Sequence, residues 1–117
     1  MAGSNITDDG PNRVTTEKVR AYLRSAPDLR RVTQGTTAEG LGIGQSTMNR
    51  ALRNEGTSYL ALLDAERKHR TKALLSRNRH ADTAAVCRVT GYSPASISKA
   101  IKRWFGSSLP EYREALQ

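Results

Sequence analysis

Residues 42–52 read GIGQSTMNRAL, and residues 91–101 read GYSPASISKAI, a second copy of the same pattern at a constant offset and without a gap. Only the glycine that opens each copy and one alanine near its end are identical. Six of the other nine aligned pairs keep their chemical character, as Arg50 does with Lys99. A repeat of this size, with a basic residue flanked by apolar ones in each copy, predicts one recognition unit used twice.

Each copy predicts a short helix, a glycine turn and a second helix. The helices are expected at about 33–41 and 45–54 in the first copy, and at about 83–90 and 94–104 in the second. Caps and breakers set these limits, because Ser, Thr and Asp favour helix starts and glycine favours helix ends. This is the helix-turn-helix pattern, in which the second helix projects far enough to enter a DNA major groove.

The rest of the chain also predicts helices. We expect one at about 16–25 with Thr15 as its cap, a long one at about 59–76, and a short one near 110–115. The middle of the long helix, ERKHRTK, is highly charged, which is typical of a helix that bridges two halves. The predicted fold is all-α, with about seven helices forming two helix-turn-helix units joined by a long linker helix.

The predicted domain organisation has four parts. They are a disordered tail at 1–13, a first helix-turn-helix unit at 14–57, the linker helix at 58–76, and a second unit with a C-terminal helix at 77–117. No segment resembles a sensing domain. We therefore expect either a two-unit regulator that is controlled by its abundance, or the C-terminal part of a longer protein.

The charge of the chain predicts an anionic partner. The net charge is +8 and the pI is about 10.3. The first 28 residues carry equal numbers of acidic and basic side chains, so the whole excess lies in residues 29–117. Nucleic acid is the expected partner. An anionic membrane surface would require a helix with bulky apolar residues opposite its charges, and none stands out.

Several other classes of protein are disfavoured by the sequence. The single cysteine, Cys87, excludes an internal disulfide and is expected to be buried and inert; no Cys/His cluster has zinc spacing. His69 and His80 are expected at the surface without a ligand or catalytic role. No nucleophile motif or phosphate-binding glycine loop is present, so we expect no enzyme activity, metal or cofactor. Without a membrane-length apolar run or a signal peptide, the expected location is the cytoplasm, in association with the nucleoid.

Two helix faces carry the predicted DNA contacts. They lie opposite the apolar stripes of the second helix in each copy. The first face comprises Gln45, Ser46, Asn49, Arg50 and Arg53, and the second comprises Pro94, Ala95, Ser98, Lys99 and Lys102. Arg50 is suited to guanine and Asn49 to adenine, since their forks match those base edges. The second face should make more phosphate contacts and discriminate less sharply, with Ala95 available to a thymine methyl group.

At this point the sequence resembles the DNA-binding domain of the AraC/XylS family of bacterial transcriptional regulators, over roughly residues 33–113. The resemblance rests on AEGLGIGQSTMNRALRNEGTSY (38–59), LLDAERKHRTKALL (62–75) and GYSPASISKAIKRWFGSSLPEYR (91–113). It implies two helix-turn-helix units held by one long helix, with recognition helices in successive major grooves on one face of DNA. It also implies promoter binding and contact with RNA polymerase.

Carried over by position, the resemblance supports Ser46, Asn49 and Arg50 in the first unit and Ala95, Ser98 and Lys99 in the second. Arg67 falls where the family often has an arginine in the linker helix. The chain also departs from the family pattern. The turn before the second recognition helix is one residue shorter than usual, and the first unit has Gln34 and Thr37 where apolar residues are usual.

Sequence-specific binding of double-stranded DNA for transcription regulation is the leading hypothesis, with a monomeric chain expected. The first alternative is an architectural protein with low sequence preference, and the second is a module that docks an acidic protein partner. Trp104–Phe105 resembles a stacking pair for single-stranded nucleic acid, but its position on an inward stripe favours a place in the core. The charged face of the linker helix is explained as well by solvation as by DNA contact.

Overall fold

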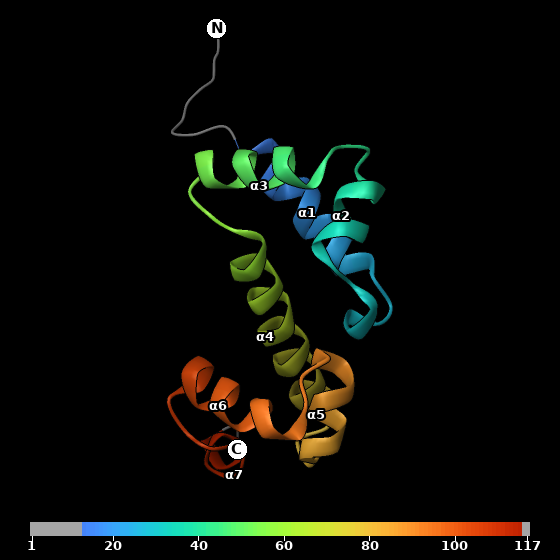
Figure 1. The fold of residues 1–117 in the computed structure, drawn as a ribbon. Coiled ribbons are helices and arrows are strands. Elements are labelled where there is room, and N and C mark those ends of the chain that lie inside the picture. The colour runs from blue at the N-terminus through green and yellow to red at the C-terminus, as the bar shows by residue number, and fades with distance from the viewer. Residues whose placement is uncertain (1–12, 116–117) are drawn as a thin grey trace, which may run out of the picture. The chain divides into compact units, whose positions relative to one another are not determined.

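The computed structural model describes residues 13–115, so the predicted tail lies almost entirely outside the described residues. This part of the chain forms seven α-helices and one short 3-10 helix, η2 (Figure 1). Their bounds are α1 Val14–Ser25, η2 Leu29–Arg31, α2 Gln34–Gly40, α3 Gln45–Asn54, α4 Tyr59–Arg77, α5 Thr83–Thr90, α6 Pro94–Phe105 and α7 Leu109–Ala115. The all-α prediction is confirmed, and α3 begins and ends at the residues that the sequence predicts.

The described chain divides into two compact units. One contains residues up to Ala26 and residues Val32–Asp64, and the other contains Pro27–Arg31 and the residues from Ala65 onward. The division falls inside α4, so this helix contributes one end to each unit. The predicted linker helix is therefore also part of the two cores. The inclusion of residues 27–31 in the second unit has no signal in the sequence pattern.

The first unit is built from α1, α2, α3 and the beginning of α4 (Figure 1). Its fully buried apolar side chains come from α1 and α3, where they recur three or four residues apart: Val19, Leu23, Met48 and Leu52. Helices α1 and α2 approach closely at Gly40, where an added Cβ would lie 2.5 Å from a ring carbon of Tyr22. The absence of a side chain at Gly40 thus allows the two helices to pack.

The start of α1 differs from the prediction. The helix begins at Val14, and its N-cap position is occupied by Arg13, which makes no side-chain capping bond. Thr15 is therefore not the cap. The carboxylate of Glu55, at the end of α3, accepts hydrogen bonds from the Thr15 N–H at 3.2 Å, and from the Thr16 N–H and hydroxyl at 2.7 Å each. A residue distant in sequence thereby satisfies the N–H groups that a helix start leaves unpaired.

Glu55 is buried, with 8% of its surface exposed. Burial raises the pKa of its carboxyl, but the hydrogen bonds from Thr16 and Thr15 outweigh this effect and hold the pKa below its ordinary value. The anion also lies at the positive end of the α1 dipole, where it is stabilising. Glu55 thus fastens the end of the first recognition helix to the start of α1.

The second unit packs η2, the rest of α4, α5, α6 and α7 around one apolar cluster. Its buried members are Leu75, Ala81, Val86, Ile97, Ala100, Ile101 and Leu109. The predicted caps of α5 and α6 are present: Asp82 accepts from Ala85 N–H, and Ser93 accepts from Ser96 N–H. Helix α6 runs through Phe105, one residue beyond the prediction.

Gly91 joins α5 to α6 in the left-handed conformation, with φ of +81°. A Cβ at this position would lie 3.2 Å from the Arg30 backbone nitrogen and 3.3 Å from the Leu29 carbonyl carbon. Leu29 is 2% exposed. Residues 27–31 therefore pack directly over the turn of the second helix-turn-helix, which requires glycine for two reasons, its backbone conformation and the space beside it.

Candidate nucleic-acid interface

Helices α3 and α6 are constructed in the same way. Each buries an apolar stripe, Met48 and Leu52 in α3 and Ile97 and Ile101 in α6, and each exposes the opposite face. The exposed predicted contacts are Gln45, Ser46, Arg50, Arg53, Pro94, Ala95, Ser98, Lys99 and Lys102. Neither helix contains an acidic residue. The two faces are consequently positive and available to an anionic partner.

Asn49 is the exception on the first face, because it is half-buried and has a partner within the unit. Its Nδ2 donates to Gln34 Oε1 at 2.8 Å, and Gln45 Nε2 lies 3.4 Å from the same oxygen. Gln34 is the first residue of α2. One side chain on the bracing helix therefore joins two predicted base contacts on the recognition helix. In the sequence alone, Gln34 stands out only as a departure from the family pattern.

Thr37, the other polar departure in α2, is fully buried. Its hydroxyl lies 3.1 Å from the hydroxyl of Tyr59, the first residue of α4. A buried polar group is tolerated when it has a hydrogen-bond partner. Gln34 and Thr37 are thus accommodated by hydrogen bonds to α3 and α4 in place of apolar contacts.

The turns that precede the recognition helices differ in length. Helix α2 ends at Gly40 and α3 begins at Gln45, whereas α5 ends at Thr90 and α6 begins at Pro94. The second turn is therefore one residue shorter than the first. Thr90 stabilises it, since its buried hydroxyl donates to the Val86 carbonyl at 2.8 Å and accepts from the Tyr92 N–H at 3.2 Å.

Arg67 lies on α4 in the second unit and is half-buried. Its Nε donates to the Thr90 carbonyl at 2.9 Å, and its guanidinium carbon lies 4.2 Å from the centre of the Tyr92 ring. A cation at this distance over an aromatic face is attracted to it. Through these contacts, Arg67 holds α4 against the turn before α6. A contact of Arg67 with DNA stays a prediction.

The aromatic residues at the end of α6 pack within the second unit. The ring centre of Trp104 lies 6.0 Å from that of Tyr92 and 6.0 Å from that of Phe105. All three residues are partly buried against the apolar cluster. Cys87 is also partly buried against this cluster, so it is less buried than expected. The packing of Trp104 and Phe105 agrees with the core interpretation.

Within residues 13–115, no group of three or more His, Cys, Asp or Glu side chains is arranged to hold a metal ion. No helix in this range is both long and apolar enough to cross a membrane. His69 and His80 are exposed.

A family model described as "Helix-turn-helix domain" matches residues 37–115. The chain belongs to the AraC-type helix-turn-helix family. The matched range begins within α2 and runs through α7, and α1 precedes it. The family is one of DNA-binding domains of transcription regulators and not a class of enzymes.

Three proteins that are similar to this chain are described as transcriptional regulators. The HTH-type transcriptional regulator VqsM of Pseudomonas aeruginosa is 34% identical over 100 residues, which are 85% of this chain and 30% of that protein. The crystal structure of the transcriptional regulator CdpR, also from Pseudomonas aeruginosa, has 30% identity and a TM-score of 0.76, covering 86% of this chain and 31% of CdpR. A DNA-binding transcriptional dual regulator from Escherichia coli K-12 has 23% identity and a TM-score of 0.78, with 96% of both chains covered, and shares the fold.

These findings confirm the predicted family and, for the AraC-type domain, sequence-specific DNA binding in transcription regulation. They do not favour the architectural alternative. The chain spans about 30% of the length of the curated relative that it matches. The DNA contacts of individual residues stay predictions.

Proposed function

We propose that this chain binds a bacterial promoter by inserting α3 and α6 into successive major grooves, and thereby regulates transcription. The observation that supports the proposal most directly is the pair of exposed, acid-free faces at matching positions of two helix-turn-helix units. Each face is backed by buried apolar side chains, which hold the helix in place while its polar side chains contact DNA.

The two faces divide the work of recognition in this proposal. Arg50 pairs with a guanine and Asn49 with an adenine, while Gln45, Ser46 and Arg53 contact neighbouring bases or phosphates. On α6, Lys99 and Lys102 contact phosphates and Ser98 and Ala95 approach base edges. Phosphate contacts supply most of the affinity, and base contacts supply the sequence preference.

The wider biological setting belongs to the same proposal. The chain acts as a monomer on double-stranded DNA, in the cytoplasm and in association with the nucleoid, and it catalyses no reaction. Contact with RNA polymerase is expected from the family resemblance. The similarity to regulators such as VqsM and CdpR supports a role at promoters.

Selection of bound duplexes from a random DNA pool tests this proposal, followed by footprinting of the selected site at a stated salt concentration. We expect two preferred subsites about 10 base pairs apart, one helical turn of DNA. A pool that remains random after several rounds would contradict sequence-specific reading. Protection confined to one groove segment would contradict the use of both recognition helices.

A further inference from the structure

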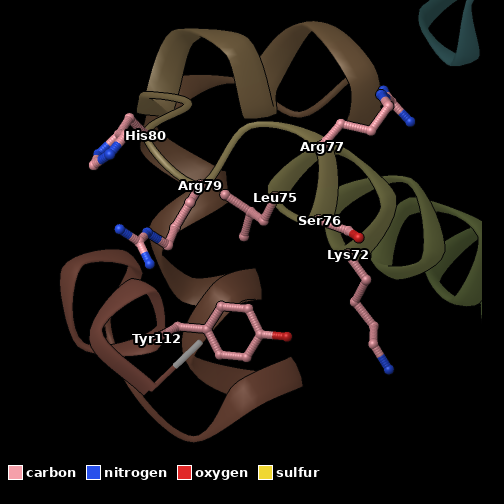
Figure 2. A pocket seen from close by; sticks show the side chains of 7 residues that line it. All are labelled: Lys72, Leu75, Ser76, Arg77, Arg79, His80 and Tyr112. Carbon is pink, nitrogen blue, oxygen red and sulfur yellow. The ribbon is translucent and has the colours of Figure 1, made fainter. Parts of the chain in front are cut away.

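The second unit contains an open pocket of about 640 Å³ that lies outside the proposed recognition faces. Its lining comes from the last turns of α4, the turn at 77–80 and α7, and no lining residue belongs to α3 or α6. Figure 2 shows Leu75 in the middle of the lining with Tyr112 below it, Arg79 and Lys72 on either side, His80 at one edge, and Arg77 pointing away from the ring of Tyr112. Its volume is in the range of small-molecule sites.

The charges of this lining are all of one sign. Lys72, Arg77 and Arg79 are exposed cations, and no acidic side chain lines the pocket. Within residues 13–115 no carboxylate forms an ion pair with any of the three. Arg70, earlier on α4, is by contrast paired with Glu66 at 3.0 Å. Cations that line one pocket without acidic partners attract an anion to it.

The pocket also offers a flat apolar surface. Tyr112 stacks on Phe105, with the ring centres 4.0 Å apart and the planes inclined by 19°. Leu75, beside it, is only 2% exposed. The ring of Tyr112 is thereby held in a fixed orientation within a lining that also carries three cations. A rigid aromatic ring next to several cations suits a ligand that has both a planar ring and multiple negative charges.

We propose that this pocket binds a small phosphorylated ligand of the nucleoside polyphosphate class. Lys72, Arg77 and Arg79 contact the phosphate groups, and the planar base packs against Tyr112. Arginine suits this role because its fork donates two parallel hydrogen bonds to a phosphate. The site is separate from DNA reading, so it adds a second anion-binding function to the proposed one.

Fluorescence titration of the full chain with trinitrophenyl-ATP tests the proposal directly. We expect saturable binding, displacement by ATP, and weaker displacement by inorganic tripolyphosphate, because tripolyphosphate lacks the ring. Equal displacement by ATP and tripolyphosphate would contradict the role of Tyr112. The double variant Arg77→Gln/Arg79→Gln should weaken binding roughly tenfold or more, since each charge-assisted hydrogen bond contributes on that scale.

The matched control is Lys18→Gln/Arg20→Gln, which removes two exposed cations from α1. It should change trinitrophenyl-ATP binding by less than about twofold, because neither side chain lines the pocket. Equal weakening by both pairs would reduce the site to nonspecific attraction and overturn the proposal. Circular dichroism of each variant verifies that the helices are retained.

DNA competition distinguishes this site from the recognition faces. Trinitrophenyl-ATP binding should survive the substitutions Arg50→Ala and Lys99→Ala, and should persist when the selected duplex is bound. Loss of the signal in those variants would place the nucleotide on α3 or α6 and overturn the pocket. Displacement by one equivalent of duplex, with weaker DNA binding in Arg77→Gln/Arg79→Gln, would identify the pocket as a contact to the DNA backbone. If the chain did not bind DNA, the nucleotide titration would still test the pocket, because that titration contains no DNA.

Discussion

The amide group of Gln34 sets the orientation of Asn49. An asparagine side chain has one carbonyl oxygen and one amino group with two hydrogens, so a bond to the amino group also fixes the oxygen. Gln34 Oε1 accepts from Asn49 Nδ2 at 2.8 Å, which leaves the second hydrogen of that group and the carbonyl oxygen for a base edge. An adenine requires both groups together. Gln34 is therefore a positioning residue for the proposed adenine contact.

A double-mutant cycle on Gln34 and Asn49 tests this role. We predict that Gln34→Ala lowers discrimination at one A·T pair by about 0.5–1.5 kcal/mol, while binding to random duplex is nearly unchanged. In an Asn49→Ala background the same change should have little further effect, because the contact that it positions is absent. Binding of the four variants to duplexes with each base at that position measures the coupling. Additive effects in the cycle would show that Gln34 acts independently.

Glu55 makes the stability of the first unit depend on pH. The pKa of its carboxyl is held below the ordinary value of 4.5, so the folded protein binds this proton less readily than the unfolded chain. Its stabilisation is therefore complete above about pH 4.5 and is lost as the pH falls through the folded pKa. Glu55→Ala removes the acceptor for Thr15 and Thr16 altogether, and should cost about 1–3 kcal/mol at neutral pH.

Urea unfolding between pH 3 and pH 7 measures this effect. The loss caused by Glu55→Ala should shrink toward the acid end of the range, because the unsubstituted protein also loses the carboxylate there. Glu111 serves as the control, because its pKa is also lowered, chiefly by the hydrogen bond from the Ser108 backbone, but its side chain is exposed. A pH-independent difference between the Glu55 variant and the unsubstituted protein would rule out the carboxylate as the cause.

At the scale of helices and turns, two glycines distinguish the effect of backbone conformation on stability from the effect of packing. Gly42 and Gly91 occupy equivalent positions in the two helix-turn-helix units, with φ of +72° and +81°. Nothing lies within 4 Å of a Cβ added to Gly42, whereas one added to Gly91 meets Arg30 and Leu29. Of these two glycines, only Gly91 has another segment of the described chain within 4 Å of the added Cβ.

We predict that Gly42→Ala costs about 1–2 kcal/mol, the strain of a left-handed residue with a Cβ. Gly91→Ala should cost more, about 2–4 kcal/mol, because it must also displace the backbone of residues 29–30. Guanidinium unfolding of both variants measures the difference. Equal losses would mean that the contact with residues 29–30 contributes nothing to stability.

Whether the start of a helix can be predicted depends on how far along the chain its capping residue lies. Thr33, Asp82 and Ser93 cap helices through bonds to residues three positions away, so the helix starts are legible in a short window of sequence. Glu55 reaches Thr16 across 39 positions, and no local pattern contains that information. Leu29 is buried in the second unit, whose other helices lie much later in the chain, so no local pattern predicts its position either.

The candidate site likewise combines features that a short stretch of sequence predicts with features that depend on distant residues. The exposed faces of α3 and α6 follow from helical periodicity, which places polar side chains opposite a buried stripe. The bond between Asn49 and Gln34 depends on how α2 crosses α3, and the packing of Arg67 on Tyr92 depends on how α4 meets the second turn. Tertiary contacts of this kind appear in the sequence only as departures from an expected residue type.

At the scale of the whole molecule, the two units offer DNA the same architecture with unequal chemistry. Arg50 and Asn49 can form paired hydrogen bonds to bases, whereas Lys99 presents a single flexible ammonium group and Ser98 a single hydroxyl. The net charge of +8 adds attraction to phosphates that carries no sequence information. The first unit is thus expected to select the sequence, and both units are expected to hold the DNA.

This asymmetry predicts different outcomes for Arg50→Ala and Lys99→Ala on the selected site. Arg50→Ala should lose about 1–3 kcal/mol at one G·C pair and retain most of its affinity for random duplex. Lys99→Ala should weaken binding to all sequences alike and lower the slope of log K against log salt by about one, as expected when one phosphate contact is removed. Titrations at four salt concentrations on matched, singly substituted and random duplexes separate these patterns. If Lys99→Ala erased preference at one base pair while Arg50→Ala weakened every duplex equally, the roles of the two units would be reversed.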